Sequence, residues 1–191
     1  NEPEFITALN DFRVGRIRGA TAAILGRKVA RFPGRDIPRL FTHNSQVEKW
    51  NTYQLGCIED AEEQVFAAVK DGAAEHCEYL AKNLVTPDDL RLKVGARVMF
   101  TANLTIEGEL VAANGDTGHV VSMEPGRVVV RKDNGHHVTA EPFTWNYDPQ
   151  DQASAKFIQF PLRLAYAMTI HKSQGLTLDA ALIDIRAARE P

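Results

Sequence analysis

The pattern of apolar and polar positions predicts helices at the start of the chain. Apolar residues recur at helical spacing between Pro3 and Gly15, and again from Thr21 to Phe32, where Pro33 stops the run. Each stretch therefore predicts a short amphipathic helix. The positions expected to face inward are Phe5, Leu9, Phe12, Ile24, Leu25, Val29 and Phe32.

A strand, a polar turn and a helix are predicted between residues 39 and 57. Arg39 to Thr42 has a strand pattern, and Ser45-Gln-Val-Glu48 has the form of a capping box that starts a helix. The stretch from Gln64 to Lys70 fits either a helix or a strand closed by a turn at Asp71-Gly72. A further helix is expected from residue 73 to residue 83.

Beyond Leu92, Val-rich and Gly-rich segments predict strands separated by turns. We expect a strand at residues 94–100, a tight turn at Asn114 to Gly118, and a hairpin that pairs 128–131 with 137–140 across Asn134-Gly135. The remaining apolar runs are residues 157–170 and 175–185. This order predicts an α/β domain interrupted by a small all-β unit at about residues 115–157.

Composition is compatible with a globular intracellular protein. The 191 residues are 44% hydrophobic, and no apolar run approaches the about 18 residues that a membrane span needs. Cys57 and Cys77 lack metal-ligand spacing and are expected to be reduced. The formal net charge is −3, yet residues 12–40 carry eight basic residues and one acid. That stretch is either a solvated surface or a face that attracts phosphates.

Several common enzyme motifs are missing from the sequence. No G-x-x-x-x-G-K-[ST] phosphate loop is present, and the glycines at 19 and 26 belong to a helix pattern. The glycines of Gly115-Asp-Thr-Gly118 precede a strand, so a structural turn is expected there. The histidines are scattered, and no Ser/His/Asp order or pair of carboxylates stands out. Ordinary hydrolase chemistry and a metal site are therefore poor fits.

The segment Thr169-Ile-His-Lys-Ser-Gln-Gly175 follows the apolar run from Leu164. If that run is an interior strand of a parallel sheet, the loop emerges at its carboxyl end, where α/β sheets place ligands. Lys172 offers a point charge, Thr169 and Ser173 offer hydroxyl groups, and Gly175 permits close backbone approach. His171 could stack on a base or pack within the loop. The residues alone leave phosphate binding and an ordinary polar loop equally open.

Three stretches together resemble superfamily 1B DNA helicases of the Pif/RecD-like group. Ala165 to Asp179 is similar to the fifth helicase motif of that group. Leu40 to Asn51 is similar to the fourth, with its Asn-x-x-Val-x-x-x-Asn helix start. Leu90 to Asn103, with Asn114 to Gly118, resembles the segment that leads into an inserted SH3-like barrel. The resemblance favours a strand rather than a helix at Gln64 to Lys70.

The resemblance implies an α/β fold: a RecA-like second motor domain with an inserted small SH3-like β-barrel. Its expected divisions are a helical lead-in at 1–35, a first part of the motor domain at 36–114, the barrel at 115–157 and a second part at 158–191. The parent would be an ATP-dependent 5′-to-3′ DNA helicase, with uses in DNA repair and recombination. The barrel would help to enclose single-stranded DNA.

The resemblance also assigns roles to particular residues. It places His43, Asn44, Thr169, His171, Lys172 and Ser173 at the DNA, and it places Gln174 and Gly175 where DNA contact is coupled to the nucleotide. No catalytic or metal-binding residue is expected here. ATP and Mg²⁺ would be held by a first RecA-like domain, and Arg186 and Arg189 lie in the wrong context for an arginine finger. The chain by itself is thus expected not to hydrolyse ATP.

Two alternatives remain open from the sequence. The chain could be a standalone module that binds nucleic acid or a protein without motor activity, or a degenerate helicase half kept for assembly. Location follows from the helicase interpretation: cytoplasmic in a bacterium or phage system, and nuclear or mitochondrial in a eukaryote.

Overall fold

The computed structural model describes residues 2–17, 19–26, 37–148, 154–176, 178 and 180–185. The chain divides into two compact units, residues 1–37 and residues 38–191. The first unit contains α1 (Glu2–Arg13) and α2 (Gly19–Gly26). Both predicted helices are therefore present, although residues 27–32 of the second lie outside the described residues. Ala8 and Thr21 are buried, whereas Leu9 and Phe12 are exposed, because two short helices cover little of each other's apolar surface.

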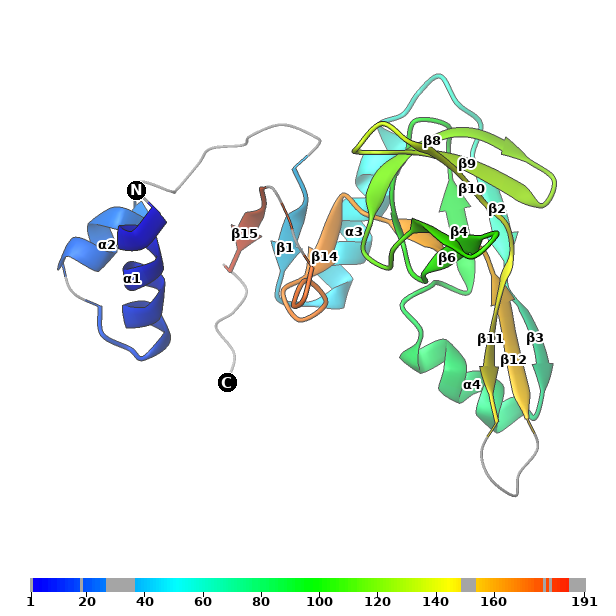
Figure 1. Cartoon of the computed structure of the whole chain (residues 1–191), viewed down its shortest axis with the longest axis horizontal. Coiled ribbons are helices and arrows are strands. Elements are labelled where there is room, and N and C mark those ends of the chain that lie inside the picture. The colour runs from blue at the N-terminus through cyan, green and yellow to red at the C-terminus, as the bar shows by residue number, and fades with distance from the viewer. Residues whose placement is uncertain are drawn as a thin grey trace. The chain divides into compact units, whose positions relative to one another are not determined.

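The second unit begins with a three-stranded parallel sheet (Figure 1). Its order is β14 (Ala167–Thr169), β1 (Arg39–Phe41) and β15 (Leu182–Asp184). Leu40 of β1 lies opposite Met168 on one side and Ile183 on the other. The apolar run from Leu164 does supply a strand of a parallel sheet, β14, but not an interior one. Among the described strands, β1 is central and β14 lies at the edge.

The helix α3 (Asn44–Gly56) follows β1 and packs on this sheet, so the predicted strand, turn and helix are confirmed. Val47 is buried against Phe41 and Ala167. The predicted capping box is not formed. The N-cap residue is His43, without a side-chain cap hydrogen bond, so Ser45 lies inside the helix instead of at its cap.

A five-stranded antiparallel sheet forms the largest β unit, in the order β10-β9-β8-β5-β13. Its strands are β5 (Arg97–Phe100), β8 (Thr117–Glu124), β9 (Arg127–Lys132), β10 (His137–Ala140) and β13 (Leu162–Leu164). The predicted hairpin is confirmed, since His137 pairs with Arg131 and Ala140 with Val128. The buried residues Val98, Phe100, Val120, Val130 and Leu162 belong to its core.

The predicted SH3-like barrel is not found in this form. Among the described strands, the two outer ones, β10 and β13, do not pair with each other, so the sheet does not close. Strands β5 and β13 also come from outside residues 115–157. A strand needs its neighbours' hydrogen bonds wherever they lie in the sequence, so a contiguous β-rich stretch need not be a separate unit.

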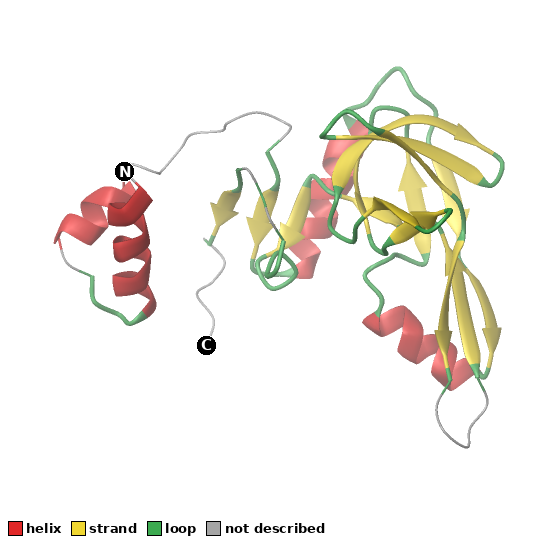
Figure 2. Cartoon of the chain, in the orientation of Figure 1, coloured by secondary structure: helices red, strands yellow, loops and turns green. Residues whose placement is uncertain are grey.

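A smaller sheet carries α4 (Ala74–Asn83) along its strands (Figure 2). Its strands are, in order, β11 (Phe143–Tyr147), β12 (Ala155–Gln159) and β3 (Val69–Gly72). The remaining pairs are β2 (Gln64–Ala67) with β4 (Asp89–Leu92), and β6 (Leu104–Ile106) with β7 (Glu109–Ala112). Cys77 and Leu80 of α4 pack on Phe157. Cys77 is buried and Cys57 partly buried, and both are free thiols.

The ambiguous stretch after residue 63 is extended, as the helicase resemblance indicates. It is nevertheless two strands, because β2 pairs with β4 as far as Ala67, whereas β3 pairs with β12. The turn predicted at Asp71-Gly72 is wrong, since both residues lie inside β3 and pair with β12. The run at residues 157–170 is likewise three strand segments in three different sheets.

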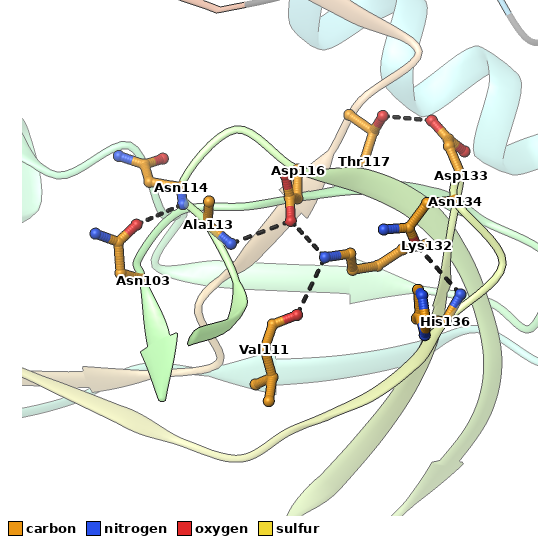
Figure 3. Close-up of polar contacts among 10 residues, drawn as sticks. All are labelled: Asn103, Val111, Ala113, Asn114, Asp116, Thr117, Lys132, Asp133, Asn134 and His136. Carbon is orange, nitrogen blue, oxygen red and sulfur yellow. Dashed lines mark hydrogen bonds and ion pairs between the residues drawn. The ribbon is translucent and has the colours of Figure 1, made fainter. Parts of the chain in front are cut away.

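An ion pair with a largely buried guanidinium holds β5, β8 and the β9–β10 turn together. Arg97 donates to both carboxylate oxygens of Asp133, at 3.3 and 2.8 Å. The Thr117 hydroxyl also donates to this carboxylate (Figure 3). Burial by itself would raise the pKa of Asp133. The hydrogen bonds from Thr117 and Arg97, with the positive charges of Arg97 and His119, nevertheless lower that pKa below its ordinary value.

We expect Asp133→Asn to lower the free energy of unfolding by about 1–2 kcal/mol at neutral pH. A depressed folded-state pKa stabilises the fold above the unfolded pKa of about 3.9, and this stabilisation is lost as pH falls through the folded value. Urea denaturation from pH 7 down to pH 3 should therefore show the difference from wild type shrinking. Asp60→Asn, at an exposed bend, controls for the loss of one charge. A difference that does not change with pH would contradict the prediction.

Candidate functional site

The segment Thr169–Gly175 folds into a tight loop directly after β14. The Thr169 hydroxyl is buried and accepts a hydrogen bond from the Lys172 peptide N–H at 3.3 Å. Ser173 donates its peptide N–H to the Thr169 carbonyl and its hydroxyl to the Ile170 carbonyl, at 3.1 and 2.8 Å. Gly175 has a φ of 84°, which favours glycine. The two hydroxyls thus shape the loop, while His171, Lys172 and Gln174 are exposed.

Asn51 of α3 fixes the strand that carries this loop. Its side-chain amide donates to the Ala167 carbonyl at 3.2 Å and accepts from the Ala167 N–H at 2.8 Å. The backbone of β14 faces β1 through the Tyr166 carbonyl and the Ile170 N–H. The peptide N–H and carbonyl of Ala167 therefore point to the edge of β14 that faces away from β1. The buried Asn51 amide bonds both groups there, as the backbone of a neighbouring strand would.

A turn of the β unit lies against the far end of the loop. The turn contains Gly115, whose φ is 98°, and a Cβ at this residue would collide with the side chain of Leu176. Asp116 accepts from the Ala113 N–H at 3.1 Å and from Lys132 at 2.7 Å, and Lys132 also donates to the Val111 carbonyl at 3.1 Å (Figure 3). The predicted structural role of this glycine-rich turn is confirmed.

A groove of about 350 Å³ runs between α3, the segment 84–91 and the loop. Asn44 and Glu48 line it from α3, Arg163 from β13 and Lys172 from the loop. The Nη1 atom of Arg163 is buried and has no hydrogen-bond partner among the described residues. The groove thus brings two cations from distant parts of the sequence beside the start of a helix.

Charges within the groove act on the pKa of two of its cations, Arg163 and Lys172. Burial lowers the pKa of Arg163, and the Glu48 carboxylate raises it. For Lys172, burial and then the charge of Arg163 lower the pKa, while Glu48 again raises it. The carboxylate of Glu48 is therefore close enough to act on both cations.

The structure brings together only some of the predicted site residues. Asn44 and Lys172 line the groove, and His43 precedes α3, where its Nδ1 lies 2.8 Å from the Thr42 hydroxyl. Sequence reasoning gave no role to Arg163, and it assigned Glu48 only to a capping box, which is not formed. A charged residue between Leu162 and Leu164 in an apolar run was the available signal for Arg163, because such a charge usually has a specific purpose.

The basic stretch is only partly described. Arg39 stacks its guanidinium 3.9 Å from the centre of the Trp50 ring, an intramolecular contact. The residues that lie outside the described part include Arg18, Arg27, Lys28, Arg31, Arg35, Arg186 and Arg189. In the part of the chain that is described, no helix is long and apolar enough to cross a bilayer, and no His, Cys, Asp and Glu residues gather as a metal site would require.

Comparison with known proteins places this architecture among DNA helicases. No protein-family model matches the chain. The ATP-dependent DNA helicase Pif1 of Bdellovibrio bacteriovorus is 34% identical over 189 residues, which cover 98% of this chain and 42% of that protein. Human PIF1 is 33% identical over 187 residues, 95% of this chain and 28% of that protein. The chain thus spans less than half the length of these relatives.

Solved structures agree with the sequence comparison. Bacteroides Pif1 in complex with ADP-AlF4 superposes with a TM-score of 0.75 at 33% identity, over 99% of this chain and 44% of that one. Bacteroides Pif1 bound to single-stranded DNA gives 0.70 at 32% identity, over 97% and 43%. The fold is therefore that of part of a DNA helicase. Over nearly its whole length, the chain is similar to a part of Pif1 helicases.

Proposed function

We propose that the chain acts as part of an ATP-dependent 5′-to-3′ DNA helicase. Its share would be to hold the backbone of single-stranded DNA and to couple the nucleotide state to translocation. The observation that carries the proposal is the groove in which Lys172 of the loop and Asn44 of α3 lie together. A lysine beside a helix N-terminus attracts phosphates irrespective of base sequence, as a translocating motor requires.

The proposed DNA contacts follow the loop and the start of α3. His43, Asn44, His171 and Lys172 are exposed, so their side chains are accessible to a strand. Thr169 and Ser173 would contribute mainly by shaping the loop, because their hydroxyls are bonded within it. We assign Gln174 and Gly175 to nucleotide coupling, since they form the turn between this DNA-facing surface and Leu176, which packs on the β unit.

The nucleotide chemistry would lie largely outside this chain. We propose that ATP and Mg²⁺ are bound with a first RecA-like domain, because this sequence has no phosphate loop. The chain alone would then lack phosphoryl-transfer activity. The Bacteroides Pif1 complex with ADP-AlF4 supports nucleotide binding in the family. An intracellular setting, with DNA repair and recombination as its uses, accords with this function.

Removing the loop cation should weaken binding in a salt-dependent way. We expect Lys172→Ala to reduce the slope of log affinity against log salt by about 0.7–1 unit for single-stranded DNA, since one fewer counterion is released. Fluorescence anisotropy of a labelled oligothymidylate over a series of NaCl concentrations measures this slope. Lys82→Ala, an exposed lysine of α4, is the matched control. If both variants keep the wild-type slope, Lys172 is not on the phosphate track.

A further inference from the structure

Three cations and three carboxylates line the groove, and one of these carboxylates, Glu48, acts on two of the cations, Arg163 and Lys172. A simple cationic DNA track does not need such a carboxylate. Glu48 is exposed on α3 and lines the same groove as Arg163 and Lys172. Two other charged residues that line the groove form ion pairs with residues other than Arg163 and Lys172. Asp88 is paired with Lys70 at 2.6 Å, and Arg91 is paired with Glu63 at 2.9 Å. Glu48 is the carboxylate whose charge reaches both Arg163 and Lys172.

The Arg163 guanidinium has a buried donor that no described residue of the chain accepts from. Its Nη1 is enclosed without an acceptor among the described residues, although arginine presents a planar fork of donors suited to an oxyanion. A buried donor of this kind normally has a partner. Because Arg163 is anchored in β13, between Leu162 and Leu164, its guanidinium is held at the groove at little entropic cost to binding.

We propose that Arg163 and Lys172 form a phosphate-binding pair in this groove, and that Glu48 is an internal counterion which a backbone phosphate of single-stranded DNA displaces. This inference rests on the proposed function. It adds Arg163 as a residue that binds the phosphate and Glu48 as a residue that limits the affinity. The fork of Arg163 and the point charge of Lys172 are complementary ways to bind one phosphate. The carboxylate offsets part of the positive charge of the empty site, so that DNA can be released at each translocation step.

The first test measures binding of a fluorescein-labelled oligothymidylate at low salt. Glu48→Gln should lower the Kd about fivefold, because one repulsive charge is removed beside the phosphate. Arg163→Met should raise the Kd at least about tenfold, and in that background Glu48→Gln should lose most of its effect. Asp89→Asn removes another carboxylate that lines the groove and should change the Kd less than about twofold.

A second test does not depend on DNA. Inorganic phosphate, with chloride as the reference, should raise the Tm of Glu48→Gln more than that of wild type, because the pair then lacks its counterion. If wild type fails to bind oligothymidylate while this difference is present, the proposed function fails and the phosphate pair stands. Equal oligothymidylate affinities and equal phosphate responses for Glu48→Gln and wild type would overturn the pair. If ATP displaces the labelled oligothymidylate more strongly than unlabelled oligothymidylate does, the assignment of the pair to DNA would be overturned.

Discussion

Replacing Asn51 with leucine is expected to lower the free energy of unfolding by about 2–4 kcal/mol. Leucine has nearly the same size but cannot bond the peptide N–H and carbonyl of Ala167, which are buried at the free edge of β14. Two buried backbone groups would lose their partners at once. Such a loss is a large fraction of a typical domain's total of about 5–15 kcal/mol.

Urea denaturation followed by Trp50 fluorescence, in a Trp145→Phe background, measures this effect close to the site. Trp50 lies on the same helix as Asn51, and its ring contacts that of Phe41 in β1. Asn44→Leu makes the same chemical change at an exposed position of α3 and should cost less than about 0.5 kcal/mol. Equal losses in the two variants would show that the Asn51 amide does not brace β14.

Introducing a methyl group at Gly118 should be comparably damaging. Gly118 lies in β8, between β5 and β9, and a Cβ there would collide with the carbonyl oxygen of Arg131 and the Cα of Lys132. These are backbone atoms of a paired strand, so no rotamer change relieves the overlap. We expect Gly118→Ala to destabilise the protein by about 3 kcal/mol, at the upper end of usual overpacking costs.

The matched control for this substitution is Gly56→Ala. Gly56 ends α3 with no atom within 4 Å of its would-be Cβ and without a positive φ, so alanine should be neutral or slightly stabilising. Thermal unfolding of both variants gives the comparison. A Tm of Gly118→Ala that equals wild type would mean that β8 and β9 can separate locally without loss.

Most local elements could be predicted from the sequence because their signals are local. The strand, turn and helix at residues 39–57 follow from hydrophobic spacing, and the hairpin at residues 128–140 follows from its Asn-Gly turn. Errors arose where a neighbour decided the outcome. Asp71 and Gly72 have turn chemistry, yet they extend β3 because β12 offers its ladder of hydrogen bonds.

The candidate site divides in the same way. The loop Thr169–Gly175 stood out because a run of polar side chains follows a buried strand, and its Lys172 does line a groove. No sequence pattern could link Arg163 with Glu48, since 115 positions separate them in the sequence. Only the tertiary structure places both side chains at one groove, where the charge of Glu48 acts on Arg163.

The sequence alone therefore determined the kinds of elements, the polar loop and the resemblance to a helicase group, because spacing and residue chemistry are read along the chain. The tertiary structure decided the sheet partners, the open arrangement of the five-stranded sheet and the role of Asn51 as a substitute strand. It also decided which charges share the groove. Hydrogen-bond partners and electrostatic neighbours depend on distance in space, and one-dimensional order does not specify that distance.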